Sequence, residues 1–295
     1  MPPTLFPTAM AADARPSSLL KDGLPCGFRA ITGPEGVLWI LREGLSLPTD
    51  VRIWDGWARG EGGRLLEGPG GRAPVYQVKP PGVGPSVIRA YRHGGILGRF
   101  FEDRFLGIGR FVAELNASEH LRSRGVATPE VMALYCRRSA GGFLRGWILT
   151  RYLSGGSNLR GWVDGGIPPG PPKKEVLRLA ARAVGSLHDA GCLHRDLNLG
   201  NLLMTPGEIH LLDLDGARLR NFLTTRERGS NLLRLYRSLA KEAAESEPLG
   251  LRERVLFLRT YSRGDERLLR SLWGYFRGRW VLGRLRRALS RRWRR

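Results

Sequence analysis

The chain is poor in cysteine and lysine, and it contains no long hydrophobic run. Its three cysteines, Cys26, Cys136 and Cys192, are odd in number and lack the spacing of metal ligands. They therefore predict neither a disulfide framework nor a zinc site, and they indicate a reducing compartment. No apolar run approaches the roughly 18 residues that a membrane-spanning helix needs.

The first residues also lack a basic stretch followed by an apolar one, so we expect no signal peptide. Residues 1–22 are rich in Pro, Ala and Ser, and we expect them to be disordered. These features predict a protein of the cytoplasm or of the cytoplasmic face of a membrane.

Acidic residues are scarce as well. The 295 residues include 48 Lys and Arg but only 27 Asp and Glu, which gives a formal net charge of +21. Such an excess predicts an anionic partner. Hydrophobic residues make up 42% of the chain, enough for a folded protein with a real core.

The most informative stretch is His-Arg-Asp-Leu-Asn-Leu-Gly-Asn at residues 194–201, followed twelve residues after Asn201 by Asp213 in Leu-Leu-Asp-Leu-Asp-Gly. Phosphoryl transfer needs a carboxylate that orients the attacking hydroxyl and accepts its proton, together with oxygen ligands for Mg²⁺. Asp196 is the candidate base, and Asn201 and Asp213 are the candidate metal ligands. The alternative is a structural surface loop in which Asp196 caps a helix.

The two motifs resemble the catalytic loop and the metal-binding segment of the protein-kinase-like fold. The resemblance implies ATP and Mg²⁺ as cofactors. It also implies a phosphate-binding cation on the third strand and an acidic partner on the helix that follows. Arg89 and Glu114 take these positions, with Arg in place of the usual Lys. Lys79, which precedes two prolines, is the second candidate for the cation.

A glycine-rich stretch lies between two expected strands, and it contains Gly70, Gly71 and Arg72. Its backbone N–H groups could cover the triphosphate of ATP. An ordinary hairpin turn is an equally good interpretation. Further on, Tyr91-Arg92-His93-Gly94-Gly95 pairs two basic side chains with two glycines beside the expected phosphate site.

The periodicity of apolar residues predicts a strand-rich lobe with one helix, a hinge, and then a helical lobe. Strands are expected at residues 37–41, 65–66, 75–78, 86–91, 131–135 and 147–152, and helices at 111–124, 173–190, 231–245 and 251–261. We divide the chain into residues 1–22, an N-lobe at 23–153, a C-lobe at 154–266 and a basic tail at 267–295. The expected fold class is α+β, two-lobed and kinase-like, with adenine near residues 149–153.

Residues 87–95 and 103–105, together with Asp-Leu-Asn in the catalytic loop and Asp-Leu-Asp-Gly after it, look like the Kdo kinases of the lipopolysaccharide kinase family. The resemblance covers roughly residues 60–240. It implies that ATP phosphorylates a Kdo sugar of a lipid A precursor at the inner face of the inner membrane. It also implies Arg rather than Lys on the third strand. Asn198, where Ser/Thr protein kinases carry Lys, and the missing Ala-Pro-Glu argue against a protein kinase.

Residues 267–295 contain eleven Arg and no acid, with Leu269, Trp273, Phe276 and Trp280 at helical spacing. An arginine-rich amphipathic helix suits an anionic membrane surface. A helix packed on the C-lobe and a nucleic-acid contact are the alternatives. A lipid-linked sugar acceptor favours the membrane and makes nucleic acid the least favoured partner.

The first hypothesis for function is therefore a Kdo kinase. The second is a kinase for another lipopolysaccharide core sugar or for a small molecule. The third belongs to a different class: a catalytically weak kinase-like protein that binds membrane or nucleic acid through its basic tail. The complete set of metal ligands argues against the third hypothesis, whereas Arg89 in place of Lys keeps it open.

Overall fold

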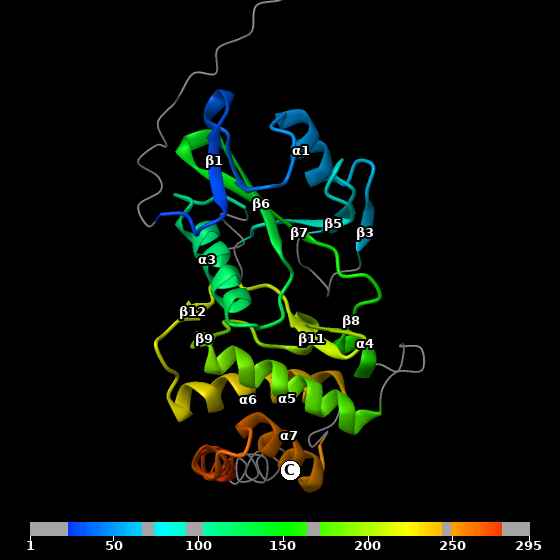
Figure 1. Cartoon of the computed structure of the whole chain (residues 1–295), viewed down its shortest axis with the longest axis vertical. Coiled ribbons are helices and arrows are strands. Elements are labelled where there is room, and N and C mark those ends of the chain that lie inside the picture. The colour runs from blue at the N-terminus through cyan, green and yellow to red at the C-terminus, as the bar shows by residue number, and fades with distance from the viewer. Residues whose placement is uncertain (1–22, 67–73, 93–102, 164–171, 244–248, 279–295) are drawn as a thin grey trace, which may run out of the picture.

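A computed structural model describes residues 23–66, 74–92, 103–163, 172–243 and 249–278. Within these residues a seven-stranded sheet with two helices lies above a mostly helical part (Figure 1). The predicted α+β fold class is confirmed. No helix of the described residues is long and apolar enough to cross a membrane.

The sheet is antiparallel throughout, and its strand order is β1-β2-β6-β7-β5-β4-β3. Its strands are β1 (Phe28–Thr32), β2 (Leu38–Arg42), β3 (Arg64–Leu66), β4 (Val75–Val78), β5 (Ser86–Ala90), β6 (Val131–Arg138) and β7 (Leu144–Arg151). All six strands expected from the sequence are present, and β1 is an addition. Short 3₁₀ turns, η1 (Pro34–Gly36) and η2 (Ala140–Gly142), lie between neighbouring strands.

Two helices cover opposite faces of this sheet, α1 (Val51–Arg59) and α3 (Gly109–Ser123). Side chains alternate between the faces of a strand, so Ile88 packs in the core that contains Trp54 of α1. Its neighbour Arg89 points to the other face, where α3 lies. The alternation along β5 thus directs Arg89 toward α3.

The sequence analysis made no prediction for residues 51–59, where α1 lies. The signal was present in Asp50, whose side chain accepts a hydrogen bond of 2.8 Å from the backbone N–H of Arg52. This is the N-cap arrangement that begins many helices.

The lower part is built around α5 (Lys173–Asp189), whose expected apolar face is buried. Around it lie α4 (Leu159–Val163), α6 (Thr225–Glu242) and α7 (Leu251–Ser262). The predicted helix at 231–245 begins earlier than expected, because Thr224 and Glu227 form a capping box at its start. Two small sheets carry the loops of the site, one of β8 (Ser157–Asn158), β10 (Leu202–Thr205) and β11 (Glu208–Leu211), the other of β9 (Cys192–Leu193) and β12 (Arg218–Leu219).

The start of the basic tail packs on this core, in agreement with the packed-helix alternative, whereas the favoured interpretation of the sequence was a membrane-facing helix from residue 267. Residues 266–278 are helical, and the Asp265 side chain accepts hydrogen bonds of 2.9 Å from the backbone N–H groups of Arg267 and Leu268. Leu272 and Phe276 are buried among the apolar side chains of the helical part. The apolar stripe at 267–278 is therefore a core face. Trp280 and the rest of the tail lie outside the described residues.

Candidate active site

The catalytic loop runs from β9 into the 3₁₀ turn η3 (Leu199–Asn201) and folds around the backbone of Asp196. The carbonyl oxygen of Asp196 accepts hydrogen bonds from the side-chain amides of Asn198, at 3.1 Å, and Asn201, at 2.8 Å. The Asn198 side chain also caps the turn by accepting from the backbone N–H of Gly200 at 2.8 Å. Since its amide nitrogen is engaged by Asp196, Asn201 keeps its side-chain oxygen for another partner.

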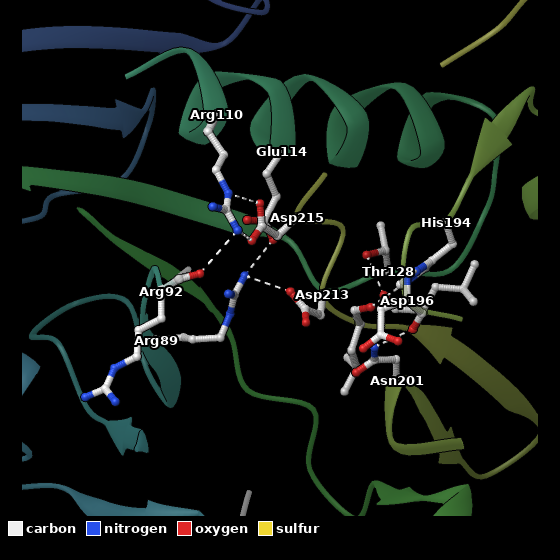
Figure 2. Close-up of polar contacts among 12 residues, drawn as sticks. Arg89, Arg92, Arg110, Glu114, Thr128, His194, Asp196, Asn201, Asp213 and Asp215 are labelled. Carbon is white, nitrogen blue, oxygen red and sulfur yellow. Dashed lines mark hydrogen bonds and ion pairs between the residues drawn. The ribbon is translucent and has the colours of Figure 1, made fainter. Parts of the chain in front are cut away.

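Asp213 lies two residues after the end of β11. Its φ of 56° is in the left-handed region, which is uncommon for a residue other than glycine. The preceding backbone N–H, of Leu212, donates to the carbonyl oxygen of Asn201 at 2.9 Å. This bond places the two predicted metal ligands on adjoining segments, with Asp196 beside them (Figure 2).

His194 links the same two segments. Its Nε2 donates to the Leu212 carbonyl oxygen at 2.9 Å, and its Nδ1 accepts from the backbone N–H of Asp196 at 3.1 Å. Burial lowers the pKa of His194, so the ring is neutral in this pairing. His194 is therefore a hydrogen-bonding residue of the loop.

Arg89 bridges the sheet, α3 and the metal-binding segment. Its Nη2 lies 2.7 Å from Oε1 of Glu114 and 3.4 Å from Oδ1 of Asp213 (Figure 2). Burial disfavours the charge of Arg89, but the carboxylates of Glu114 and Asp213 outweigh it and raise its pKa. The structure thus brings the predicted cation and its predicted acidic partner together. Burial raises the pKa of the Glu114 carboxyl, against the attraction of Arg89.

Arg110 was not predicted as a site residue. Its Nε lies 2.6 Å from Oδ1 of Asp215, its Nη2 contacts Oδ2 of the same carboxylate, and Nη2 also donates to the carbonyl oxygen of Arg92 at 3.2 Å. Asp215 is the second acid of the Leu-Leu-Asp-Leu-Asp-Gly stretch. In the structure it holds the first turn of α3 against the metal-binding segment. A basic residue at the start of the expected helix was the only signal.

Of the other predicted cofactor-binding residues, the structure describes Lys79 alone. Lys79 is exposed just after β4 and forms no ion pair within the described part of the chain. Gly70, Gly71 and Arg72 lie outside the described residues, as do His93 and the two glycines after it.

Beneath the catalytic loop lies a buried network of uncharged hydrogen bonds that the sequence analysis missed. The Asn231 amide donates to the carbonyl oxygen of His194 at 2.7 Å, and its oxygen accepts from Nε2 of His188 at 2.9 Å. Nδ1 of His188 lies 2.7 Å from the Tyr261 hydroxyl. Burial lowers the pKa of His188 to about 4, which keeps the ring neutral. The network connects α5, α6 and α7 to the catalytic loop.

The side-chain oxygens of Asn201 and Asp213 suit a hard cation that takes its other ligands from outside the protein. Within the described ranges no three His, Cys, Asp or Glu side chains gather as a metal site. A cation here would be held by oxygens of Asn201 and Asp213 and would take its remaining ligands from water and phosphate. Mg²⁺ is commonly bound in this way, through one or two carboxylates and substrate phosphates.

A carboxylate on a hydrogen-bonded loop, two candidate oxygen ligands and a half-buried, ion-paired arginine match the elements of a kinase-like phosphotransferase site. The model of the lipopolysaccharide kinase (Kdo/WaaP) family matches residues 59–261, and the chain belongs to this family. The protein is a kinase that acts in lipopolysaccharide synthesis. The resemblance read from the motifs is thereby confirmed.

The names of curated relatives agree with this family assignment. The chain is 34% identical over 181 residues to a 3-deoxy-D-manno-octulosonic acid kinase of Xylella fastidiosa (strain M12), a match covering 60% of this chain and 70% of the relative. It is 35% identical over 179 residues to the enzyme of the same name from Xanthomonas campestris pv. campestris (strain B100), with 58% and 68% covered. A solved structure of WaaP in complex with acyl carrier protein is 23% identical, with a TM-score of 0.49 over 78% of this chain and 96% of that one.

Proposed function

We propose that the protein transfers the γ-phosphate of ATP to a hydroxyl group of a Kdo sugar on a lipid A precursor. The acceptor is supported by the names of the relatives, which are 3-deoxy-D-manno-octulosonic acid kinases. The transfer is supported above all by one observation, the hydrogen-bonded junction of the catalytic loop and the metal-binding segment beside Asp196. A kinase for another lipopolysaccharide core sugar is the competing reading.

In this proposal Asp196 orients the acceptor hydroxyl and takes its proton as the bond to the γ-phosphorus forms and the bond from that phosphorus to ADP breaks. Asn201 and Asp213 would hold Mg²⁺, which, when bound, neutralises charge on the phosphate oxygens. Arg89 contacts the α- and β-phosphates, and Glu114 holds its guanidinium in place. Gly70, Gly71 and Arg72 cover the triphosphate, and adenine lies near residues 149–153.

We also propose how the chain is divided into lobes and where in the cell the enzyme acts. Residues 23–153 would act as the nucleotide-covering lobe and residues 154–266 as the lobe that carries the catalytic loop. The enzyme would work at the cytoplasmic face of the inner membrane, bound at its surface. A lipid-linked acceptor and a net charge of +21 support this location.

The acceptor is tested by incubating the full chain with labelled ATP and Mg²⁺ and with one of three detergent-dispersed acceptors. These are a lipid A precursor with Kdo, the same precursor without Kdo, and a core lipid carrying heptose. Transfer only to the Kdo-bearing lipids, located on Kdo by mild acid hydrolysis, is the expected result. Label on heptose would favour the competing reading.

The site is tested with Asp196→Asn and Asp213→Asn. Each should lower kcat at least about 10³-fold, because a general base and a metal ligand act directly on the transferring group. The matched control is Asp50→Asn, which alters an acid that caps α1 and should leave kcat within about twofold. Near-normal turnover in either site variant, with an unchanged unfolding temperature, would remove that residue from the site.

The tail is tested by removing residues 279–295 and keeping the packed helical residues 266–278. Binding to anionic vesicles should fall about tenfold or more, since each arginine near such a surface contributes on the order of 1 kcal/mol. High salt should weaken binding of the full chain only in part, because an aromatic contribution is not screened. Unchanged vesicle binding by the folded truncated chain would place the contact elsewhere.

A further inference from the structure

Residues 218–222 follow Asp215 closely and are exposed along their whole length, although two of them are large and apolar. Leu219 is 40% exposed and Phe222 is 75% exposed. Neither belongs to a hydrophobic core of the described chain. Single exposed apolar residues are ordinary, but two within one short segment indicate a contact surface.

This segment is fastened to the catalytic loop. In the pairing of β12 with β9, Leu219 lies opposite Cys192, and the backbone N–H of Arg220 donates to the Gly191 carbonyl oxygen at 2.8 Å. Gly191 has a φ of 75°, and a Cβ there would lie 2.0 Å from the carbonyl oxygen of Arg220. Only glycine permits this approach. Residues 218–222 thus keep a fixed position relative to Asp196, and so does any surface that they contact.

The surroundings of the segment are cationic. Arg218 and Arg220 belong to it, Arg226 lies in the first turn of α6, and Arg195 of the catalytic loop packs against Gly216. All four arginines are exposed, and none forms an ion pair with another described residue.

Two acids lie near these arginines. Glu227 accepts hydrogen bonds from the backbone and hydroxyl of Thr224, which lower the pKa of its carboxyl, and the charge of Arg220 lowers it further. Asp189 pairs with Arg228 at 2.8 Å. The four arginines outnumber these acids, so the apolar tip lies in a surface of net positive charge. It lies with β12 at the left edge of the molecule in Figure 1, away from helical residues 266–278 at the bottom.

Resting on the proposed lipid-linked acceptor, we propose that residues 218–222 dock on an anionic lipid surface. Leu219 and Phe222 enter the headgroup region, and the four arginines meet lipid phosphates. Aromatic side chains favour the membrane interface, and cations are attracted to an anionic leaflet. A nucleic acid or an acidic protein could also meet the arginines, and the proposed lipid-linked acceptor is what favours a lipid surface. The docked segment presents the catalytic loop to a sugar at the membrane surface.

The test places a polarity-sensitive fluorophore on the full chain at Phe222→Cys. Cys26→Ser removes the exposed native thiol, and Cys136 and Cys192 are buried. With phosphatidylcholine vesicles containing phosphatidylglycerol, the emission should shift to the blue and be quenched by brominated lipid. The same label at Leu251→Cys, a residue that is 64% exposed at the start of α7, should not respond.

A second arm measures affinity. The double variant Leu219→Ser/Phe222→Ser should bind the anionic vesicles about tenfold more weakly, because it loses both inserted side chains. The matched double variant Leu65→Ser/Leu251→Ser changes exposed leucines elsewhere and should bind as the unmodified chain does.

The outcomes separate the two proposals. An unshifted label at position 222 on vesicle-bound protein, or equal shifts at 222 and 251, overturns the docking surface, and so does an absence of vesicle binding. Phosphate transfer to detergent-dispersed Kdo-lipid is assayed alongside with the unmodified protein. Its absence overturns the proposed function, whatever the label at 222 reports.

Discussion

On the sheet side of the site, Arg89 and Arg110 are held by carboxylates, whereas on the helical side the loop of Asp196 is held by uncharged hydrogen bonds. The carboxylates of Asp213 and Asp215 and the two arginines keep partial contact with water. His188 and Asn231, by contrast, are fully or almost fully buried. The two regions therefore fix their functional residues by different means.

The difference has a physical consequence. A partly hydrated ion pair can exchange one charged partner for another, including a phosphate, because water screens the groups during the exchange. A buried uncharged network cannot open without leaving polar groups unsatisfied, which costs about 1–3 kcal/mol for each group. The helical side thus holds the catalytic loop in one position, and in the proposed function the sheet side supplies charges that can be redirected to the nucleotide.

The largest effect is expected from breaking the charged side. Arg89→Met should lower kcat/KM for ATP by about 10²-fold to 10³-fold, because the phosphates lose a charge-assisted contact and Glu114 is left buried without its cation. Lys79→Met, which removes an exposed lysine just after β4, should stay within about twofold. An ATP titration of both variants decides the matter, and the reverse ranking would move the phosphate contact to Lys79.

A smaller effect is expected from breaking the uncharged side. Asn231→Leu leaves the His194 carbonyl oxygen and Nε2 of His188 without partners, so the free energy of unfolding should fall by about 3 kcal/mol. Because the catalytic loop loses a hydrogen bond that positions it, the decrease in kcat should be larger than the increase in KM for ATP. Ser230→Ala, on the exposed side of the same helix, is the control. A stable variant with unchanged kcat would show that the network does not position the loop.

The pH dependence of the free energy of unfolding gives a further test of the buried network around His188. Burial lowers the pKa of His188 from its usual value near 6.5 to about 4, so between these values the unfolded chain binds a proton that the folded chain does not. The free energy of unfolding should therefore fall as pH decreases from about 6.5 to about 4, by about 3 kcal/mol in total.

His188→Gln keeps a polar side chain beside Asn231 but does not titrate, and it should remove this part of the acid sensitivity. Urea unfolding of both proteins across the same pH range measures the effect. Parallel pH curves for the variant and the unmodified chain would contradict the assignment.

Much of the architecture followed from local patterns. Alternation of apolar residues predicted the strands around Arg89, and helical spacing predicted α3 and α5, because those periods reflect which face of an element is buried. The spacing of Asp196, Asn201 and Asp213 predicted one site, since it matches the catalytic loop and the metal-binding segment of the kinase-like fold. The catalytic and metal-binding roles of these residues stay predictions.

Other features depend on contacts between distant segments. Arg110 and Asp215 are 105 residues apart, and His188 and Tyr261 are 73 apart. The local periodicity of apolar residues does not indicate which distant side chains will be in contact. Likewise, the stripe at 267–278 was read as a membrane-facing surface, because an apolar face looks the same in sequence whether lipid or protein covers it.

The sequence by itself determined the family, the fold class and the three polar residues of the catalytic and metal-binding motifs, because these depend on short spacings and local periodicity. Tertiary structure alone decided that Arg110 meets Asp215, that Asn231 supports the catalytic loop, and that Leu272 and Phe276 close the core. The physical reason is that the partner of a side chain depends on how whole helices and strands pack against one another. Each such contact forms only when these elements have packed together.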